Sequence, residues 1–394
     1  MKNRLFAIIF GIALLFSAAA SEPAVVDTPI VLQSGDVSIH FLELGNKYTG
    51  DCVYINYGTI DILIDAGSKQ SSAAAIKAYI DTYIKDNKLE YVIATHAHED
   101  HIAGFSGSKN VPGILESYET GLIIDFPKTN SASAVYKNYI EARAKAIANG
   151  AVHYTALECF NNKGNAERVY DLGGGVKIEI LYNWYYENQA RNENNYSVCL
   201  KIIQNEYQYL FTGDLEKEGE EKLVDYYEEN FGGLGRCVLY KGGHHGSNTS
   251  SSEKLLEAIT PEYVCVCSCA GSLEYRASPP NVFPGQDFAD RIAPYTDRVY
   301  ITTIVTDYSK NEYGPFNGTV IFLVSKNTIT VICSNNSLKL KDTEWFRKNR
   351  TMPEPWKLFF PFFLHEATEK RKRRREKGFL FSFLPAPYSL SPAP

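Results

Sequence analysis

Short apolar runs recur along most of this chain, and longer stretches with apolar residues at every third or fourth position lie between them. The short runs predict strands at 37–44, 53–56, 61–64, 91–95 and 176–181. The longer stretches predict helices at 71–86, 132–148, 217–230 and 253–259. Strands and helices that alternate in this way are typical of sheets covered by helices, so the pattern predicts an α/β fold.

Two of the apolar runs end in an aspartate. The run at 60–64 is followed by Asp65-Ala66-Gly67, and the run at 209–211 is followed by Thr212-Gly213-Asp214. A single aspartate at the end of a strand is more often a turn residue than a ligand. These two aspartates therefore indicate a ligand site only if other polar residues lie at the same edge of a sheet.

Five of the eight histidines lie in two short clusters. The first cluster occupies 96–101 (His-Ala-His-Glu-Asp-His), directly after the strand predicted at 91–95. The second is His244-His245, which glycines flank on both sides, so that the backbone can approach an ion closely. Imidazole and carboxylate groups are ligands that zinc and similar divalent ions prefer. A solvated polar loop is the alternative interpretation. Two histidine clusters and two strand-end aspartates in one chain, however, favour a metal site.

The order of these motifs resembles the metallo-β-lactamase superfamily. Within it, four further stretches resemble the soluble domain of the ComEC-like, DNA-internalisation competence subgroup: Gly50-Asp51-Cys52, Asn194-Asn195-Tyr196-Ser197, Lys241 with the His-His-Gly-Ser run, and Asn317-Gly318-Thr319. The resemblance covers about residues 32–335. It implies a four-layer αββα sandwich of two mixed sheets with outer helices.

The resemblance also implies a site for one or two divalent ions, with zinc expected and manganese or iron as alternatives. The residues that would bind or orient the ions are Asp65, His96, His98, Asp100, His101, Asp214 and His245. By motif match, His96 and His98 would bind the first ion, and Asp100, His101 and His245 the second. Asp214 would bridge both ions. Asp65 would orient the site, and Asp100 in particular, from behind the ligands.

Two further residues are expected to act on the substrate together with Asp100 and Asp214. His244 would face the substrate or complete the shell of the first ion. Lys241 would contact an anionic substrate, although a lysine at the end of a strand is equally typical of a solvated position.

One departure from the superfamily pattern concerns the first ion. Many members place another histidine before the bridging aspartate, but the only histidine between 102 and 213 is His153, in what reads as a strand. The expected station instead contains Asn194 and Asn195. The first ion would then be held more weakly, with Asn195, His244 or water filling the position.

Composition and charge limit the partners. The chain has 394 residues, 44% of them hydrophobic and 22% charged, which is typical of a globular protein. Its formal net charge is −6; residues 366–377 contribute +4, and Lys2 with Arg4 contributes +2, which leaves about −12 for the rest. A domain with this net negative charge repels long polyanions, so a small or wall-linked phosphoester is favoured over nucleic acid as the substrate. Of the eight cysteines, Cys265, Cys267 and Cys269 alternate along a predicted strand as small buried residues.

Both ends of the chain differ from the middle. Residues 1–20 have two basic residues, an apolar run and a small-residue end, which predicts a signal peptide and a secreted, periplasmic or cell-surface protein. The hydrolase domain is predicted at 32–335. Residues 336–394 form an extension in which 370–377 hold seven basic residues out of eight. That tail is expected to be disordered, with contact to anionic lipid or nucleic acid as the alternative.

The function expected from these features is an exported, metal-dependent hydrolase. An ion that lowers the pKa of bound water to about 7 provides hydroxide at neutral pH. A phosphodiesterase is the first expectation. A hydrolase of β-lactams or lactones, and an exported binding module with a degenerate metal site, are the alternatives.

Overall fold

The computed structural model describes residues 24–25, 30, 32–274, 282–325 and 328–357. The predicted signal peptide and the basic tail lie outside these residues. Within them, the structure has no helix whose length and hydropathy would suit a bilayer span.

The first sheet is mixed and contains nine strands of the described chain. From edge to edge they are β1 (Ala24–Val25), β19 (Thr328–Cys333), β18 (Val320–Ser325), β2 (Val37–Phe41), β3 (Val53–Tyr57), β4 (Ile60–Ile64), β5 (Lys88–Ile93), β8 (Glu119–Asp125) and β9 (Val152–Thr155). Pairing is antiparallel from β19 to β4 and parallel from β4 to β9. The short β6 (Gly107–Ser108) and β7 (Val111–Pro112) form a separate hairpin.

The second sheet is also mixed and contains eight strands of the described chain. In spatial order they are β10 (Val169–Gly173), β11 (Val176–Ile180), β12 (Leu200–Gln204), β13 (Tyr207–Phe211), β14 (Leu239–Lys241), β15 (Tyr263–Ala270), β16 (Val299–Asp307) and β17 (Glu312–Pro315). The strands from β13 to β16 are parallel, and the pairs at both ends are antiparallel. All eight residues of β15 are buried, as expected for a parallel strand covered on both faces.

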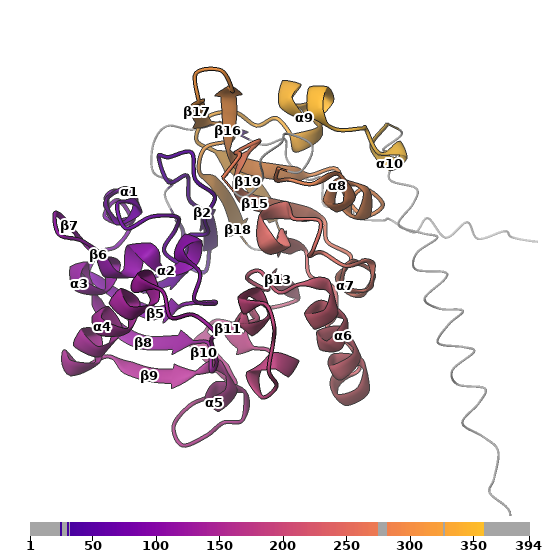
Figure 1. The fold of residues 1–394 in the computed structure, drawn as a ribbon. Coiled ribbons are helices and arrows are strands. Elements are labelled where there is room, and N and C mark those ends of the chain that lie inside the picture. Colours follow the sequence, from indigo (N-terminus) through magenta and orange to yellow (C-terminus); the bar gives the residue numbers. More distant parts are fainter. Residues whose placement is uncertain (1–23, 26–29, 31, 275–281, 326–327, 358–394) are drawn as a thin grey trace, which may run out of the picture.

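Helices lie on the outer sides of both sheets. Figure 1 shows α1 (Ser72–Ile80), α2 (Glu99–Ser106), α3 (Ile114–Ser117) and α4 (Ala134–Ala148) together beside the first sheet, and α6 (Lys217–Phe231), α7 (Glu253–Ile259) and α8 (Gln286–Ile292) beside the second. The short α5 (Ala156–Phe160) lies below them in the same view. One continuous apolar cluster fills the space between the layers. The predicted fold class, a sandwich of two mixed sheets with outer helices, is confirmed.

Several predicted boundaries differ from the structure, and two of the differences have a clear cause. The helix expected at 71–86 ends at Ile80, because the Thr82 hydroxyl and amide both donate to the carbonyl of Tyr79 and tighten the chain into turns. The strand expected at 91–95 ends at Ile93, because the Thr95 amide donates to the Asp65 carboxylate instead of to a neighbouring strand. This second difference places His96 and His98 on the loop before α2, while Asp100 and His101 lie in the first turn of that helix.

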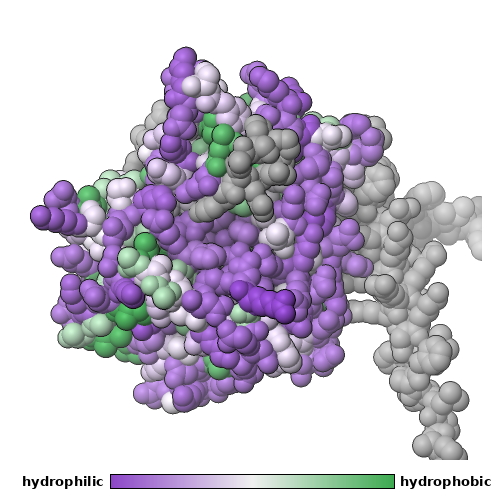
Figure 2. All heavy atoms as spheres, viewed as in Figure 1, coloured by the Kyte–Doolittle hydropathy of each residue, from purple (hydrophilic) through white to green (hydrophobic). Residues whose placement is uncertain are grey.

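All eight cysteines lie in the described part of the chain, and each is buried as a free thiol. Figure 2 shows that the viewed face is mostly hydrophilic, with apolar residues in small separate groups. The described C-terminal segment, with α9 (Glu344–Asn349) and α10 (Glu354–Lys357), packs on the sandwich through Trp345, Phe346 and Trp356.

Candidate metal centre

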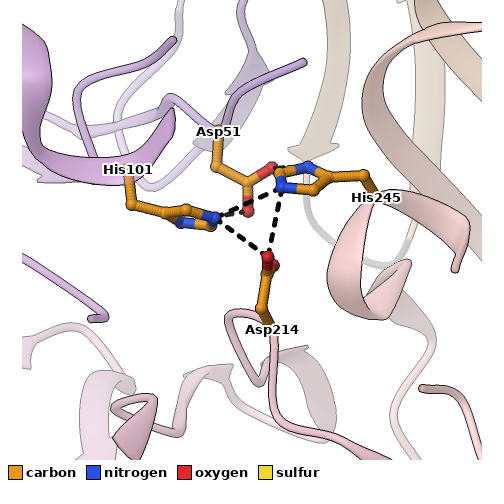
Figure 3. Close-up of side chains that lie close together, drawn as sticks. All are labelled: Asp51, His101, Asp214 and His245. Atoms are coloured by element: carbon orange, nitrogen blue, oxygen red, sulfur yellow. Dashed lines mark hydrogen bonds and ion pairs between the residues drawn. The ribbon is translucent and has the colours of Figure 1, made fainter. Parts of the chain in front are cut away.

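The candidate site lies where four parallel strands end. Asp65 follows β4 and the first histidine cluster follows β5, while Asp214 follows β13 and His245 follows β14. Because the carboxyl ends of these strands in the two sheets meet, groups separated by up to 180 residues come together. Figure 3 shows His101, Asp214 and His245 pointing toward one another, with Asp51 beside the two imidazoles.

Three ligand atoms converge on one point, which we call the tight station, and Asp100 lies next to one of them. His101 Nε2 lies 3.3 Å from His245 Nε2, and each nitrogen lies 3.2 Å from Asp214 Oδ2. Asp100 Oδ2 lies 3.2 Å from His245 Nε2. Ligands of a tetrahedral zinc ion with bonds of about 2.0–2.1 Å are separated by about 3.3 Å. The tight station therefore has the donor set and the spacing of a divalent metal site.

In both imidazoles of the tight station, Nδ1 faces away from the ligand atoms and has a polar partner of its own. His101 Nδ1 lies 2.7 Å from Asp65 Oδ2, and His245 Nδ1 donates to the carbonyl of Cys267 at 2.9 Å. Such contacts fix the tautomer and orientation of metal-binding imidazoles. Asp65 is thus not placed as a ligand: it orients the site as expected, but through His101 and Thr95 rather than through Asp100.

Asp51 belongs to this centre and has no assigned role in the sequence analysis. It lies before β3, and its Oδ1 is 3.1 Å from His245 Nδ1. Together with His101, Asp214 and His245 it forms a buried cluster whose ligand atoms all lie within 4.8 Å of one another. The stretch Gly50-Asp51 repeats the Gly-Asp pair of Gly213-Asp214, which is the sequence signal that could have identified it.

Lys241 lies inside the site and not at its rim. Only 2% of it is exposed, and its ammonium contacts Asp51 Oδ2, Asp214 Oδ1 at 3.3 Å and the carbonyl of Gly213 at 3.0 Å. The expectation that Lys241 contacts an anionic substrate is therefore corrected, and so is the solvated alternative. The lysine links two buried carboxylates and leaves Asp214 Oδ2 directed at the tight station.

The charges of the centre depend on one another. Burial acts to raise the pKa of Asp214, but His245, His101 and Lys241 outweigh it and hold that pKa well below its usual range. Burial acts to lower the pKa of His101, but Asp214 and Asp65 outweigh it and raise that pKa. A cation at this position is thus balanced by carboxylates, whether it is a proton or a metal ion.

A second group of ligand atoms, which we call the loose station, belongs to His96, His98 and His244. His96 Nε2 and His98 Nδ1 are 3.0 Å apart, whereas His244 Nε2 is 3.9 Å from Asp214 Oδ2. Burial, His101 and His98 lower the pKa of His96, which keeps this imidazole neutral and able to bind a metal. Burial lowers the pKa of His244 to about 4.

The position of the missing histidine is filled by Asn194. Its Nδ2 lies 3.4 Å from His244 Nε2, and its buried Oδ1 has no hydrogen-bond partner among the described residues. Asn195 points elsewhere, because its Oδ1 accepts the amide of Glu216. His153 is a strand residue of β9, where it pairs with Asp125 at 2.8 Å. The loose station thus contains an amide where an imidazole is expected.

The second histidine cluster has a strained backbone. His244 and His245 have φ values of 45° and 54°, in the left-handed region that favours glycine. Each costs about 1–3 kcal/mol and persists only where the surroundings enforce it. This conformation belongs to a single turn, η3 (Gly243–Gly246), which places both imidazoles at the site.

Comparison with known proteins agrees with this geometry. Residues 45–128 match the family model described as "Metallo-beta-lactamase superfamily". The chain is 35% identical over 122 residues to "Competence protein ComA" of Neisseria gonorrhoeae, which covers 31% of this chain and 17% of the relative. It is 23% identical over 179 residues to "ComE operon protein 3" of Bacillus subtilis, which covers 44% of this chain and 19% of the relative. The chain thus spans less than a fifth of the length of either relative.

Among solved structures, the metallo-beta-lactamase fold protein YhfI from Bacillus subtilis is similar over 67% of this chain and 96% of its own, with a TM-score of 0.37 and 13% identity. The matched residues 45–128 contain Asp51, Asp65 and the first histidine cluster. The resemblance predicted from the sequence is confirmed: residues 45–128 match the family model of the metallo-beta-lactamase superfamily, and parts of the chain are similar to competence proteins.

Proposed function

We propose that this chain is a metal-dependent hydrolase whose substrate is a small phosphodiester. One observation carries the proposal: His101, His245 and Asp214 direct three buried ligand atoms at one point with the spacing of ligands of a tetrahedral ion, and Asp100 lies 3.2 Å from one of them. A divalent ion bound there supplies a nucleophile from water and neutralises negative charge that develops on the substrate.

Other residues of the site bear on how a substrate approaches and what attracts it. His98 and His244 are partly exposed, so they mark the side from which a substrate approaches. Lys241 is too deeply buried to touch a substrate, so attraction of an anion depends on the ions themselves. The acidic body supports a compact substrate over a long groove-bound duplex.

The test is a substrate panel on the purified, metal-loaded protein: a chromogenic phosphodiester, a phosphomonoester, single-stranded DNA, a chromogenic cephalosporin and a lactone. Hydrolysis of the phosphodiester, lost with a chelator and in His101→Ala, is expected. Hydrolysis of the cephalosporin or lactone alone would replace the phosphodiester. If the metal-loaded protein cleaves nothing, the binding-module alternative replaces the hydrolase.

Export is part of the proposal. Its support is the basic start and the apolar run within residues 2–20. Protein recovered from the producing cell should begin at or near Ser21 and lie outside the cytoplasm. An intact Met1 on cytoplasmic protein contradicts export. Binding of the full chain to anionic vesicles, measured beside neutral vesicles, tests whether the basic tail contacts lipid.

A further inference from the structure

The strained histidine turn is enclosed by a segment that follows β15, Val282–Gly285, which we call the wall segment. The amide of Gly285 donates to the carbonyl of Gly246 at 2.8 Å. The Phe283 ring centroid lies 5.5 Å from that of His244 and 6.3 Å from that of His245. A β-carbon on Gly246 would lie only 2.9 Å from Pro284 Cβ, so the turn and the wall segment are in close contact.

The wall segment is held from its far side by Arg350. The guanidinium donates from Nη2 to the carbonyl of Val282 at 2.6 Å and from Nε to the carbonyl of Pro284 at 2.9 Å. These two carbonyls flank Phe283. Arg350 is only 8% exposed, and its guanidinium stacks on Trp345 at 4.8 Å. The planar fork of arginine suits two neighbouring carbonyls in a way that a lysine ammonium does not.

Arg350 is itself fixed by the packing of the C-terminal segment. It directly follows α9, whose first turn is capped by the Thr343 side chain. Lys339 and Lys341 both pair with Asp297, at 2.9 and 2.7 Å. The Thr351 amide donates to Gln286 Oε1 at 2.7 Å, and Gln286 Nε2 donates to the Thr351 carbonyl at 2.9 Å. The guanidinium is therefore part of a rigid support and not a mobile surface group.

We infer that Arg350 is a positioning residue of the metal centre: it fixes the wall segment against the His244–Gly246 turn and so directs the His245 imidazole at the tight station. Two consecutive histidines in the left-handed region relax unless neighbours hold them, and the wall segment is packed directly on this turn. The inference rests on the proposed metal function.

The test uses the full chain and cobalt(II) as the probe, because the visible absorption of cobalt reports ligand geometry. Arg350→Ala is compared with Arg347→Ala, a matched control in the adjoining helix α9, where the arginine side chain is 61% exposed and pairs with Asp342 at 3.2 Å. Removal of supporting partners weakens metal binding by about 10–100-fold. We expect that loss, with an altered cobalt spectrum, for Arg350→Ala, no change for Arg347→Ala, and partial recovery for Arg350→Lys.

The outcomes separate this inference from the proposed function. If wild-type protein binds no cobalt, the metal function fails. If wild-type protein binds cobalt and Arg350→Ala binds it equally well, with the same spectrum, Arg350 only stabilises the fold and the inference is overturned. If Arg350→Ala does not fold, Arg350→Lys decides by the same comparison: weaker binding supports the inference, and wild-type binding overturns it.

Discussion

The two stations of the metal centre both face Asp214 Oδ2 but differ in the burial and the identity of their other ligands. In the tight station, Asp65 holds His101 and the Cys267 carbonyl holds His245, and the ligands are buried. In the loose station, His244 Nδ1 also has a partner, Thr249 Oγ1 at 2.9 Å, but His98 and His244 are partly exposed, and the third position is an asparagine. Imidazoles of both stations thus have the supporting partners that metal ligands need, and the difference lies in burial and in the amide that stands in place of an imidazole.

This comparison leads to an asymmetric expectation for metal binding. The first equivalent should enter the tight station, and a second should bind the loose station with lower affinity. Four experiments would break or sharpen this expectation.

The largest effect should come from Lys241→Met. The ammonium joins Asp51 and Asp214, both buried, and its removal leaves two carboxylates facing each other without the lysine charge between them. Breaking a buried pair in this way costs about 3–5 kcal/mol. Denaturant unfolding of the metal-free protein should show that loss, and bound metal should reduce it. Lys222→Met, at a partly exposed lysine that pairs with Glu218, is the control. Wild-type stability would mean that the buried link is unimportant.

Asp214→Ala should remove metal from both stations, because Asp214 is the only carboxylate that both contain. The affinity should fall by more than about 100-fold, since the loss of a supporting partner alone costs about 10–100-fold. Metal content after dialysis measures it. Asp225→Ala, at an exposed aspartate of α6, should retain wild-type content. Equal metal content in the two variants contradicts the central position of Asp214.

His101→Ala and His98→Ala form a matched pair of one ligand from each station. His101→Ala should lose the tight equivalent, whereas His98→Ala should keep one equivalent at nearly wild-type affinity. Titration calorimetry with zinc gives both the number of sites and the affinity. If the two variants lose the same equivalent, the stations are not independent sites.

The smallest effect should come from Asn194→His. This change places an imidazole at the position that faces His244, where the asparagine now lies. The second equivalent should bind about tenfold more tightly, which corresponds to about 1.4 kcal/mol, because imidazole is a better ligand than an amide. The first equivalent should not change. A gain in the first equivalent instead would assign Asn194 to the tight station.

The sequence indicated much of this centre because most ligands lie in short clusters or at the ends of apolar runs. It did not indicate the burial of Lys241, since the same Tyr-Lys-Gly stretch fits a solvated strand end, and only the fold brings Asp51 to its ammonium. The role of Arg350 could not be predicted from the sequence for a similar reason. It lies about 100 residues from the histidine turn, and it acts through backbone carbonyls, which carry no side-chain signature in the sequence.

The distribution of tryptophan has a practical consequence. The chain has three tryptophans. Trp345, which stacks on Arg350, and Trp356, whose indole donates to the Thr296 carbonyl, are both buried in the C-terminal segment, while Trp184 is 44% exposed. The tryptophan fluorescence of a Trp184→Phe variant, excited at wavelengths that tyrosine does not absorb, would therefore come from that segment. Its emission wavelength would report the docking of α9 and α10 on the sandwich, optically and without any substrate.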